Sequence, residues 1–564
     1  MQKYIIFYLI IYGMFSSGIS AQNLYLDMEG NSNSETLVLN ELNYLKTHAD
    51  LASINTEVDS VQTSLYRLGY IEAQLSSLER TNDSTFLAHF KLGNKFESIK
   101  IHYTNSKFIH PEILSSFSTS VSDTYFVLPY QKITSTLKRL SSTLAEQGLP
   151  FSKVQLKNIT IKDNSLAADL ELIPDQQKRI IDAIEIKGYE QFPRSFLRYY
   201  LNIKKNQVFN LTEIKKKTEQ VQSLNFANQI KPPEVLFTKD STTLYLYLEK
   251  QKSNSFDGFL GFGTNEDTNK IQFNGYLNLN LINTLNFGEA FRLFYKSDET
   301  DQQLFEVNAA LPYLFKSPVG LAMELRVFRR DSSFTTVDQS IKTTFQINPK
   351  HQVALGLTAT ASNNLFSSGT VSDIANYNTR FLTGSYQYRN LQFNNALFQT
   401  KSSFYFEGNL GSRKNAGTSQ NQSRFVIDAM HIFQLNLKNS LYFKLHGETI
   451  SSDTYFENEL LRFGGINSIR GFQENSLLGN TYGILNTEYR FTLSPSLYVH
   501  SITDLGYFEN NISDLKKKLF SYGIGLGVLT KAGLFKLNYA AAKVENEPFK
   551  VSNSKVHISL TTIF

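Results

Sequence analysis

The sequence contains no cysteine and no tryptophan, and it has only 12 prolines in 564 residues. Without cysteine no disulfide can form within this chain, so its stability must come from packing and from backbone hydrogen bonds. Long hydrophobic runs are also missing after Phe15, whereas a membrane-spanning helix needs roughly 20 apolar residues. The mature chain is therefore expected to have no transmembrane helix.

A strong charge of one sign is absent as well. The net charge is +5, and the longest basic run is Lys215, Lys216 and Lys217, which we interpret as a solvated helix face. The charge pattern therefore predicts no nucleic-acid partner.

Motifs for metal binding, phosphate binding and nucleophilic catalysis are missing too. Gly523, Gly525 and Gly527 alternate, but no helix follows them, so small lumen-facing residues explain them better than a dinucleotide site does. The sequence predicts a protein that is not an enzyme and has no cofactor. A Ser/His/Asp set assembled from distant strands stays open.

An export signal stands at the start of the chain. Met1, Gln2 and Lys3 precede a largely apolar segment, residues 4–15, and a stretch of mostly small residues, 16–21. This order is typical of a secretory signal peptide. Residues 1–21 are therefore predicted to be a signal peptide that is cleaved after Ala21.

Between residues 23 and 250 the sequence repeats itself. Three amphipathic helices end near Gly69, Gly148 and Asn225, a period of roughly 78 residues that indicates an internal repeat. Apolar residues share one face of each helix: Val58, Val61, Leu65 and Leu68; Ile133, Leu137, Leu140 and Leu144; Leu211, Ile214, Val221 and Leu224. Each repeat is predicted as a β-α-α-β-β unit, with domains at 22–96, 97–176 and 177–250.

After Lys252 the helical pattern gives way to alternating strands. Between Ile271 and Leu281, apolar residues alternate with Gln, Asn and Tyr, and similar strands of about ten residues follow to the end of the chain. One face suits lipid and the other suits water. Residues 255–564 are therefore predicted to form an outer-membrane β-barrel of about 16 antiparallel strands. A soluble β-sandwich is the alternative.

A series of short motifs resembles one protein family. The series is Phe463 to Phe472 (FGGINSIRGF), Gly479-Asn480, Glu488 to Phe491 (EYRF), Asp504 to Gly506 (DLG) and the terminal Phe564. With the order of signal peptide, repeats and barrel, it resembles the BamA/TamA family of outer-membrane assembly proteins, the bacterial surface antigen family. In that family the repeats are called POTRA domains.

The resemblance implies that the loop with the Arg-Gly-Phe tip folds into the lumen and touches the inner wall. The predicted luminal latch consists of Gly464, Gly465, Arg470, Gly471, Phe472, Asp504 and Gly506. The planar guanidinium of Arg470 suits a carboxylate, which supports a pair with Asp504. A solvated loop arginine is the alternative.

The barrel seam is predicted between the first strand, near 256–263, and the final strand, 555–564. Its candidate residues are Gly258, Gly261, Gly263, Leu560 and Phe564. Glycine weakens strand pairing, so this closure is expected to be the weakest part of the wall. Thr562 departs from the family, where a larger apolar residue is usual.

The resemblance implies an outer-membrane protein of a Gram-negative bacterium, with POTRA domains in the periplasm. Three repeats match the TamA-like subgroup. The predicted function is assembly: POTRA domains capture unfolded outer-membrane client proteins, which enter the lipid bilayer through the seam. A periplasmic or inner-membrane partner at the POTRA domains stays open. The alternative function is a secretion channel of the two-partner type, or a passive pore.

Overall fold

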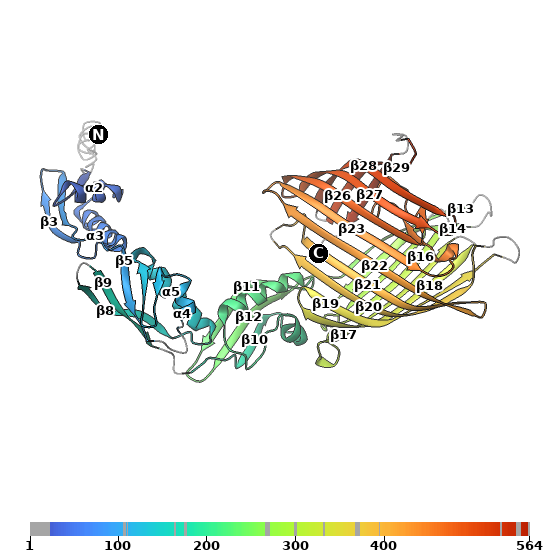
Figure 1. The fold of residues 1–564 in the computed structure, drawn as a ribbon, viewed down its shortest axis with the longest axis horizontal. Helices are drawn as coiled ribbons and strands as arrows, with labels where there is room; N and C mark the ends of the chain where they lie inside the picture. The colour runs from blue at the N-terminus through green and yellow to red at the C-terminus, as the bar shows by residue number, and fades with distance from the viewer. Residues whose placement is uncertain are drawn as a thin grey trace, which may run out of the picture. The chain divides into compact units, whose positions relative to one another are not determined.

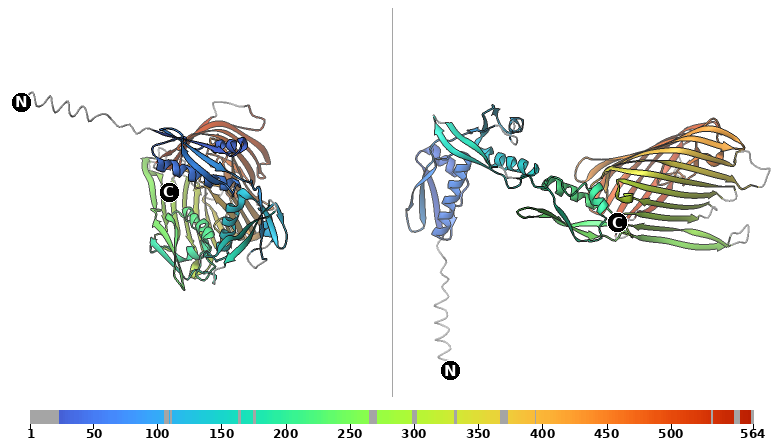
Figure 2. Two further views of the ribbon diagram at one scale, coloured as in Figure 1. Left: turned by 90° about the vertical axis from the view of Figure 1, so that its left-hand side faces the viewer. Right: turned by 90° about the horizontal axis from the view of Figure 1, so that it is seen from below.

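The computed structural model describes residues 23–104, 109, 111–162, 165–173, 177–264, 271–297, 302–330, 333–366, 373–393, 395–530, 533–548 and 554–561 (Figures 1 and 2). The predicted signal peptide, Thr562 and Phe564 lie outside this part. The chain divides into two units, one up to residue 180 with 208–211, the other formed by 181–207 and 212–564. None of the described helices is long and apolar enough to span a membrane.

The first unit begins with a small α+β domain. Its elements are β1 (Leu24–Gly30), α2 (Asn33–Glu41), β2 (Thr47–His48), α3 (Leu51–Leu68), β3 (Gln74–Arg80) and β4 (Thr85–Lys91), with sheet order β2-β1-β4-β3. Helix α3 begins where the Asp50 carboxylate accepts a hydrogen bond of 2.8 Å from the Ser53 backbone N–H, which lowers the pKa of Asp50. The helix ends at Gly69, whose φ of +102° suits glycine.

A second α+β domain follows in the same unit. Its elements are β5 (Ser98–His102), α4 (Pro111–Ser115), β6 (Ser120–Val121), β7 (Tyr125–Pro129), η1 (Tyr130–Lys132), α5 (Ile133–Glu146), β8 (Lys153–Lys162) and β9 (Ser165–Ile173). The sheet order is β6-β7-β5-β9-β8, so the hairpin β6–β7 is added to the predicted β-α-α-β-β pattern. Strands of two and five residues are too short for a clear alternation, which is why the sequence pattern did not reveal them.

The second unit contains nearly all of a third α+β domain. Its elements are β10 (Ala183–Gly188), the π-helical turn η2 (Phe196–Tyr200), α6 (Leu211–Thr218), η3 (Glu219–Ser223), β11 (Ala227–Phe237) and β12 (Thr242–Lys250). The sheet order is β10-β12-β11, with β10 parallel to β12.

The rest of the second unit is a 16-stranded antiparallel sheet rolled into a barrel (Figures 1 and 2). Its strands are β13 (Ser255–Thr264), β14 (Ile271–Ile282), β15 (Ala290–Ser297), β16 (Gln302–Leu311), β17 (Val319–Arg330), β18 (Phe334–Asn348), β19 (His351–Asn364), β20 (Tyr377–Leu391), β21 (Thr400–Asn415), β22 (Thr418–Gln434), β23 (Asn439–Ser451), β26 (Thr481–Ser494), β27 (Leu497–Asn510), β28 (Leu515–Thr530), β29 (Gly533–Val544) and β30 (Lys555–Thr561). The turn η4 (Leu314–Lys316) lies between β16 and β17, and η5 (Glu457–Glu459), β24 (Leu461–Phe463) and β25 (Leu477–Gly479) lie between β23 and β26. The predicted fold class and strand number are thus confirmed.

The alternation along each strand separates the two faces of the barrel wall. On β27 the side chains of Leu505 and Tyr507 are 42% and 40% exposed, whereas Asp504 is fully buried. Apolar groups therefore point outward, as lipid requires, and polar groups point into the lumen. This arrangement decides where a charged cluster can form.

Candidate functional site

The chain between β23 and β26 enters the barrel as a long loop that contains the predicted latch. Gly464, Gly465 and Gly471 have φ values of +112°, +95° and +86°, which other residues rarely adopt. A Cβ at position 464 would lie 2.6 Å from the backbone oxygen of Gln473. The sharp turns of the loop therefore depend on glycine.

Arg470 lies at the tip of this loop against strand β27. Its Nε and Nη2 donate to the two carboxylate oxygens of Asp504 at 2.9 and 2.6 Å, and its backbone N–H donates to the same group at 3.0 Å. Arg470 is 4% exposed and Asp504 is 0% exposed. The structure thus brings together the two residues that the sequence paired, in the bidentate geometry that suits a guanidinium.

Glu488 on β26 extends this pair into a cluster. Arg470 Nη1 donates to Glu488 at 2.5 Å, and the other oxygen of Glu488 accepts from Arg490 Nε at 2.7 Å. The Arg490 guanidinium stacks over the Tyr442 ring at 3.9 Å. We name Arg470, Asp504, Glu488 and Arg490 the lumen cluster; it holds two cations and two carboxylates, so its charges balance.

The tip of the loop also reaches the last strands of the barrel. The backbone N–H of Gly471 donates to Nε2 of His557, on β30, at 2.9 Å. A Cβ at position 471 would lie 2.7 Å from the Cβ of Ala542 on β29, so only glycine fits here. Ile469, beside Gly506, belongs to an apolar cluster against which Phe472 packs. The tip therefore joins strands β26 and β27 to the end of the sheet.

The base of the loop is attached to a different part of the wall. Glu457 accepts from Arg330 on β17 at 3.2 Å, and the amide of Asn458 donates to Ser362 on β19 at 2.8 Å. Glu459 forms a buried ion pair with Arg413 on β21. The loop is thus fixed at its base and at its tip to separate groups of strands.

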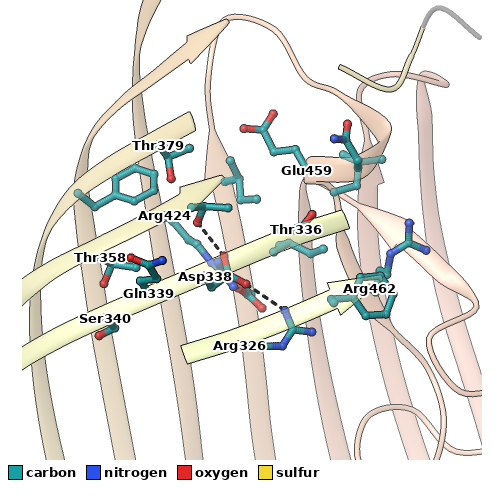
Figure 3. Close-up of a pocket in the computed structure, with 18 of the residues that line it drawn as sticks. Arg326, Thr336, Asp338, Gln339, Ser340, Thr358, Thr379, Arg424, Glu459 and Arg462 are labelled. Atoms are coloured by element: carbon teal, nitrogen blue, oxygen red, sulfur yellow. Dashed lines mark hydrogen bonds and ion pairs between the residues drawn. The ribbon is translucent and has the colours of Figure 1, made fainter. Parts of the chain in front are cut away.

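Beside the loop base the lumen holds a polar cavity of about 370 Å³. Figure 3 shows Arg326, Asp338 and Arg424 on the barrel strands and Glu459 and Arg462 on the loop around it. Arg326 Nη1 lies 3.2 Å from Asp338. Among the described residues no group of His, Cys, Asp and Glu could hold a metal ion.

The predicted seam residues lie on the two edges of the sheet. Gly258, Gly261 and Gly263 are on β13 and Leu560 is on β30, while Phe564 lies outside the described residues. Within residues 255–264 and 555–561 no backbone pairing joins β13 to β30, whereas every pair of neighbouring strands in the sheet order is hydrogen-bonded. The predicted antiparallel pairing of β13 with β30 therefore stays a prediction.

Three contacts of the site were not foreseen. The alternation placed Glu488 and Arg490 on the water-facing side, but not beside Arg470. The ion pair of Arg413 with Glu459 joins residues 46 positions apart, and the hydrogen bond from Gly471 to His557 joins residues 86 positions apart. Only the rolled sheet brings such groups together, so no local signal could have revealed them.

Comparisons with known proteins agree with this architecture. The Omp85 superfamily domain matches residues 269–564, and a POTRA domain, the surface antigen variable number repeat, matches residues 179–250. BamA from Haemophilus ducreyi lacking POTRA domains 1–3 is similar at a TM-score of 0.50 and 14% identity, covering 81% of this chain and 97% of its own. CdiB from Escherichia coli is similar at a TM-score of 0.50 and 12% identity, covering 88% and 97%. No curated protein matches the chain.

Proposed function

The chain belongs to the Omp85 superfamily, and we propose that it is an assembly factor of the TamA/BamA type, which inserts client proteins into the outer membrane of a Gram-negative bacterium. The observation that carries this proposal is the seam. Within the 16-stranded sheet, as far as the structure describes it, β13 and β30 are the two strands with a neighbour on one side only. Unpaired N–H and C=O groups at a strand edge are a template for an incoming strand. A client hairpin can therefore pair with these edges and enter the bilayer sideways.

The occupied lumen supports a lateral route over passage through the barrel. The loop is bound at its base through Glu459 and at its tip through Arg470, and a client that crossed the lumen would have to break both buried ion pairs. Breaking a buried pair costs about 3–5 kcal/mol. A route between β13 and β30 leaves both pairs intact.

Capture of the client is proposed to occur at an open strand edge of the POTRA domains, in the periplasm. Strand β8 is an edge strand of ten residues, and its Ile159 and Ile161 are 60% and 45% exposed. Such an edge suits strand addition. The edge strand β11 instead carries Pro232 and Pro233, which cannot donate backbone hydrogen bonds to a client.

The seam can be tested with engineered disulfides, because the chain has no native cysteine. One cysteine is placed within 258–262 and the other within 556–562, and the variant that cross-links is compared with the same variant under reducing conditions. Locking the seam should abolish assembly of client barrels in cells, while the protein stays folded and inserted.

The control is Leu357→Cys with Leu382→Cys, two outward-facing residues directly opposite each other on β19 and β20. This lock should leave assembly unchanged. A seam-locked protein with full activity would favour the secretion channel, and ion conductance would then separate a channel from a closed barrel. For capture, a photo-cross-linker at Ile159 should trap clients more than one at Ile230 on β11.

A further inference from the structure

The third α+β domain packs tightly on the rim of the barrel. The Phe196 ring contacts the Tyr313 ring edge to face at a centroid distance of 4.9 Å, and Tyr199 Oη donates to the backbone oxygen of Lys316 at 2.5 Å. A Cβ at Gly288 would lie 1.9 Å from the Phe196 ring, so glycine makes room for it. These contacts place η2 against the turns at the rim of the wall.

A groove of about 540 Å³ lies next to this contact, between the third domain and the end of β18. The third domain contributes its basic residues, and the barrel contributes Phe345, Ile347 and the turn at Lys350. The groove therefore combines a charged side with an apolar side.

The charged side has an excess of cations. Five basic residues line the groove: Arg198, Lys204, Lys216, Lys217 and Lys350. Lys217 forms an ion pair of 2.7 Å with Glu213, the one carboxylate in the lining. In the described part of the chain, no carboxylate lies within ion-pair distance of the other four side chains, so the groove has positive charge left for an anion.

The apolar side belongs to the lipid-facing surface. Phe345 and Ile347 are 41% and 52% exposed and alternate with less exposed residues on β18, so they share the outward face of the wall. They stand at the end of the strand, where the apolar band of a barrel meets the lipid headgroups. A free phosphate would make no favourable contact with these two apolar side chains, whereas an acyl chain would pack against them.

We propose that this groove binds an anionic phospholipid of the leaflet on the side of the third domain. The phosphate group lies among Arg198, Lys204, Lys216 and Lys350, and the first carbons of the acyl chains lie along Phe345 and Ile347. The basic run 215–217 is thus more than a solvated helix face, because Lys216 and Lys217 line a lipid site.

The absence of tryptophan makes a direct binding assay available. In the full-length protein, Thr343→Trp puts one fluorophore on the outward face of β18, two residues from Phe345 and outside the groove lining. The protein is reconstituted in phosphatidylcholine vesicles, and phosphatidylglycerol with brominated acyl chains is added as a quencher. Quenching relative to brominated phosphatidylcholine reports the preference for the anionic lipid.

Phosphatidylglycerol should be preferred by about fivefold or more, the effect of one basic residue near an anionic surface. The triple variant Arg198→Gln, Lys204→Gln, Lys216→Gln should reduce this preference to about one. The matched control Lys205→Gln, Lys215→Gln, Lys438→Gln removes the same charge from exposed residues outside the groove and should keep it. Lys350→Gln, on the barrel alone, should reduce the preference partly.

Three results would overturn the proposal. The first is no preference for phosphatidylglycerol in the Thr343→Trp protein, and the second is an equal loss of this preference in the triple variant and its control. The third is a loss of this preference on addition of inorganic phosphate that sodium chloride of the same ionic strength does not cause. The second result would mean general surface attraction, and the third would mean a site for free anions. The assay measures lipid binding in the absence of any client, so its outcome is independent of the assembly function.

Discussion

The α+β domains and the barrel have opposite interiors. The first domain encloses an apolar core in which Leu26, Leu39, Ile54 and Leu65 are fully buried. The barrel instead turns its apolar side chains outward and encloses the lumen cluster and a polar cavity. The difference follows from the solvent, because water surrounds the domains and lipid surrounds the barrel.

This contrast predicts which substitutions each region tolerates. An apolar core loses contacts and gains a cavity when a side chain is shortened. A polar lumen is sensitive to single charges, because each buried ion needs its partner. Charge changes should therefore damage the barrel most, and apolar truncations the α+β domains.

The largest effect is expected for Arg470→Ala. It leaves Asp504 without its guanidinium and removes one of two cations from Glu488, which should lower the free energy of unfolding by about 3–5 kcal/mol. Asp504→Ala should cost less, because Glu488 still accepts from Arg470. The heat-dependent shift of the barrel on gels reports its unfolding in detergent and measures the loss of stability in both variants.

The double variant Arg470→Ala, Asp504→Ala should be little worse than Arg470→Ala alone. Additive losses would show that the two groups do not act as a pair. Arg326→Ala is the control, because its side chain is 39% exposed and its ion pairs should contribute no more than about 1 kcal/mol.

The next effect is expected for Leu65→Ala in the first domain. The side chain is fully buried, so its truncation should cost about 2–5 kcal/mol, against less than about 0.5 kcal/mol for Leu37→Ala on α2, which is 65% exposed. Thermal unfolding of a fragment of residues 23–176, followed by circular dichroism, measures the difference. Equal losses would mean that the first domain has no well-packed core of its own.

That fragment is preferred to residues 23–250. The sequence pattern places the end of the third domain at residue 250, but Phe196 and Tyr199 of this domain pack against the barrel turn at Tyr313. Without the barrel these rings face water. The shorter fragment should therefore be soluble and monomeric, and the longer one should associate with itself more strongly.

The smallest effect compares two glycines of the barrel. Gly471 and Gly417 have φ values of +86° and +85°, but a Cβ at 471 would meet Ala542 whereas one at 417 would meet nothing within 4 Å. Gly417→Ala should cost about 1–2 kcal/mol for the backbone conformation alone, and Gly471→Ala about 1–3 kcal/mol more. Equal losses in unfolding experiments would mean that the tip does not press against β29.

Periodicity in the sequence was sufficient to predict most of the elements. The apolar spacing from Val58 to Leu68 and the stop at Gly69 predicted the second half of α3, and the alternation from Ile271 to Leu281 predicted β14. The hairpin β6–β7 was missed because its strands are short. The helix in the third domain breaks into α6 and η3, a change that its apolar spacing does not express.

The amino-acid pattern is enough to predict the kinds of surface in this protein: apolar cores in the repeats, and a barrel wall with one face for lipid and one for water. It also determined that Arg470 would need a carboxylate, because a guanidinium keeps its charge wherever it lies. Three further contacts are visible only in the folded chain: Glu488 shares this arginine, Gly471 donates to His557, and basic residues of the third domain line a groove beside Phe345. Alternation is a local property of the chain, whereas these contacts depend on strand register and on how the sheet rolls into a barrel.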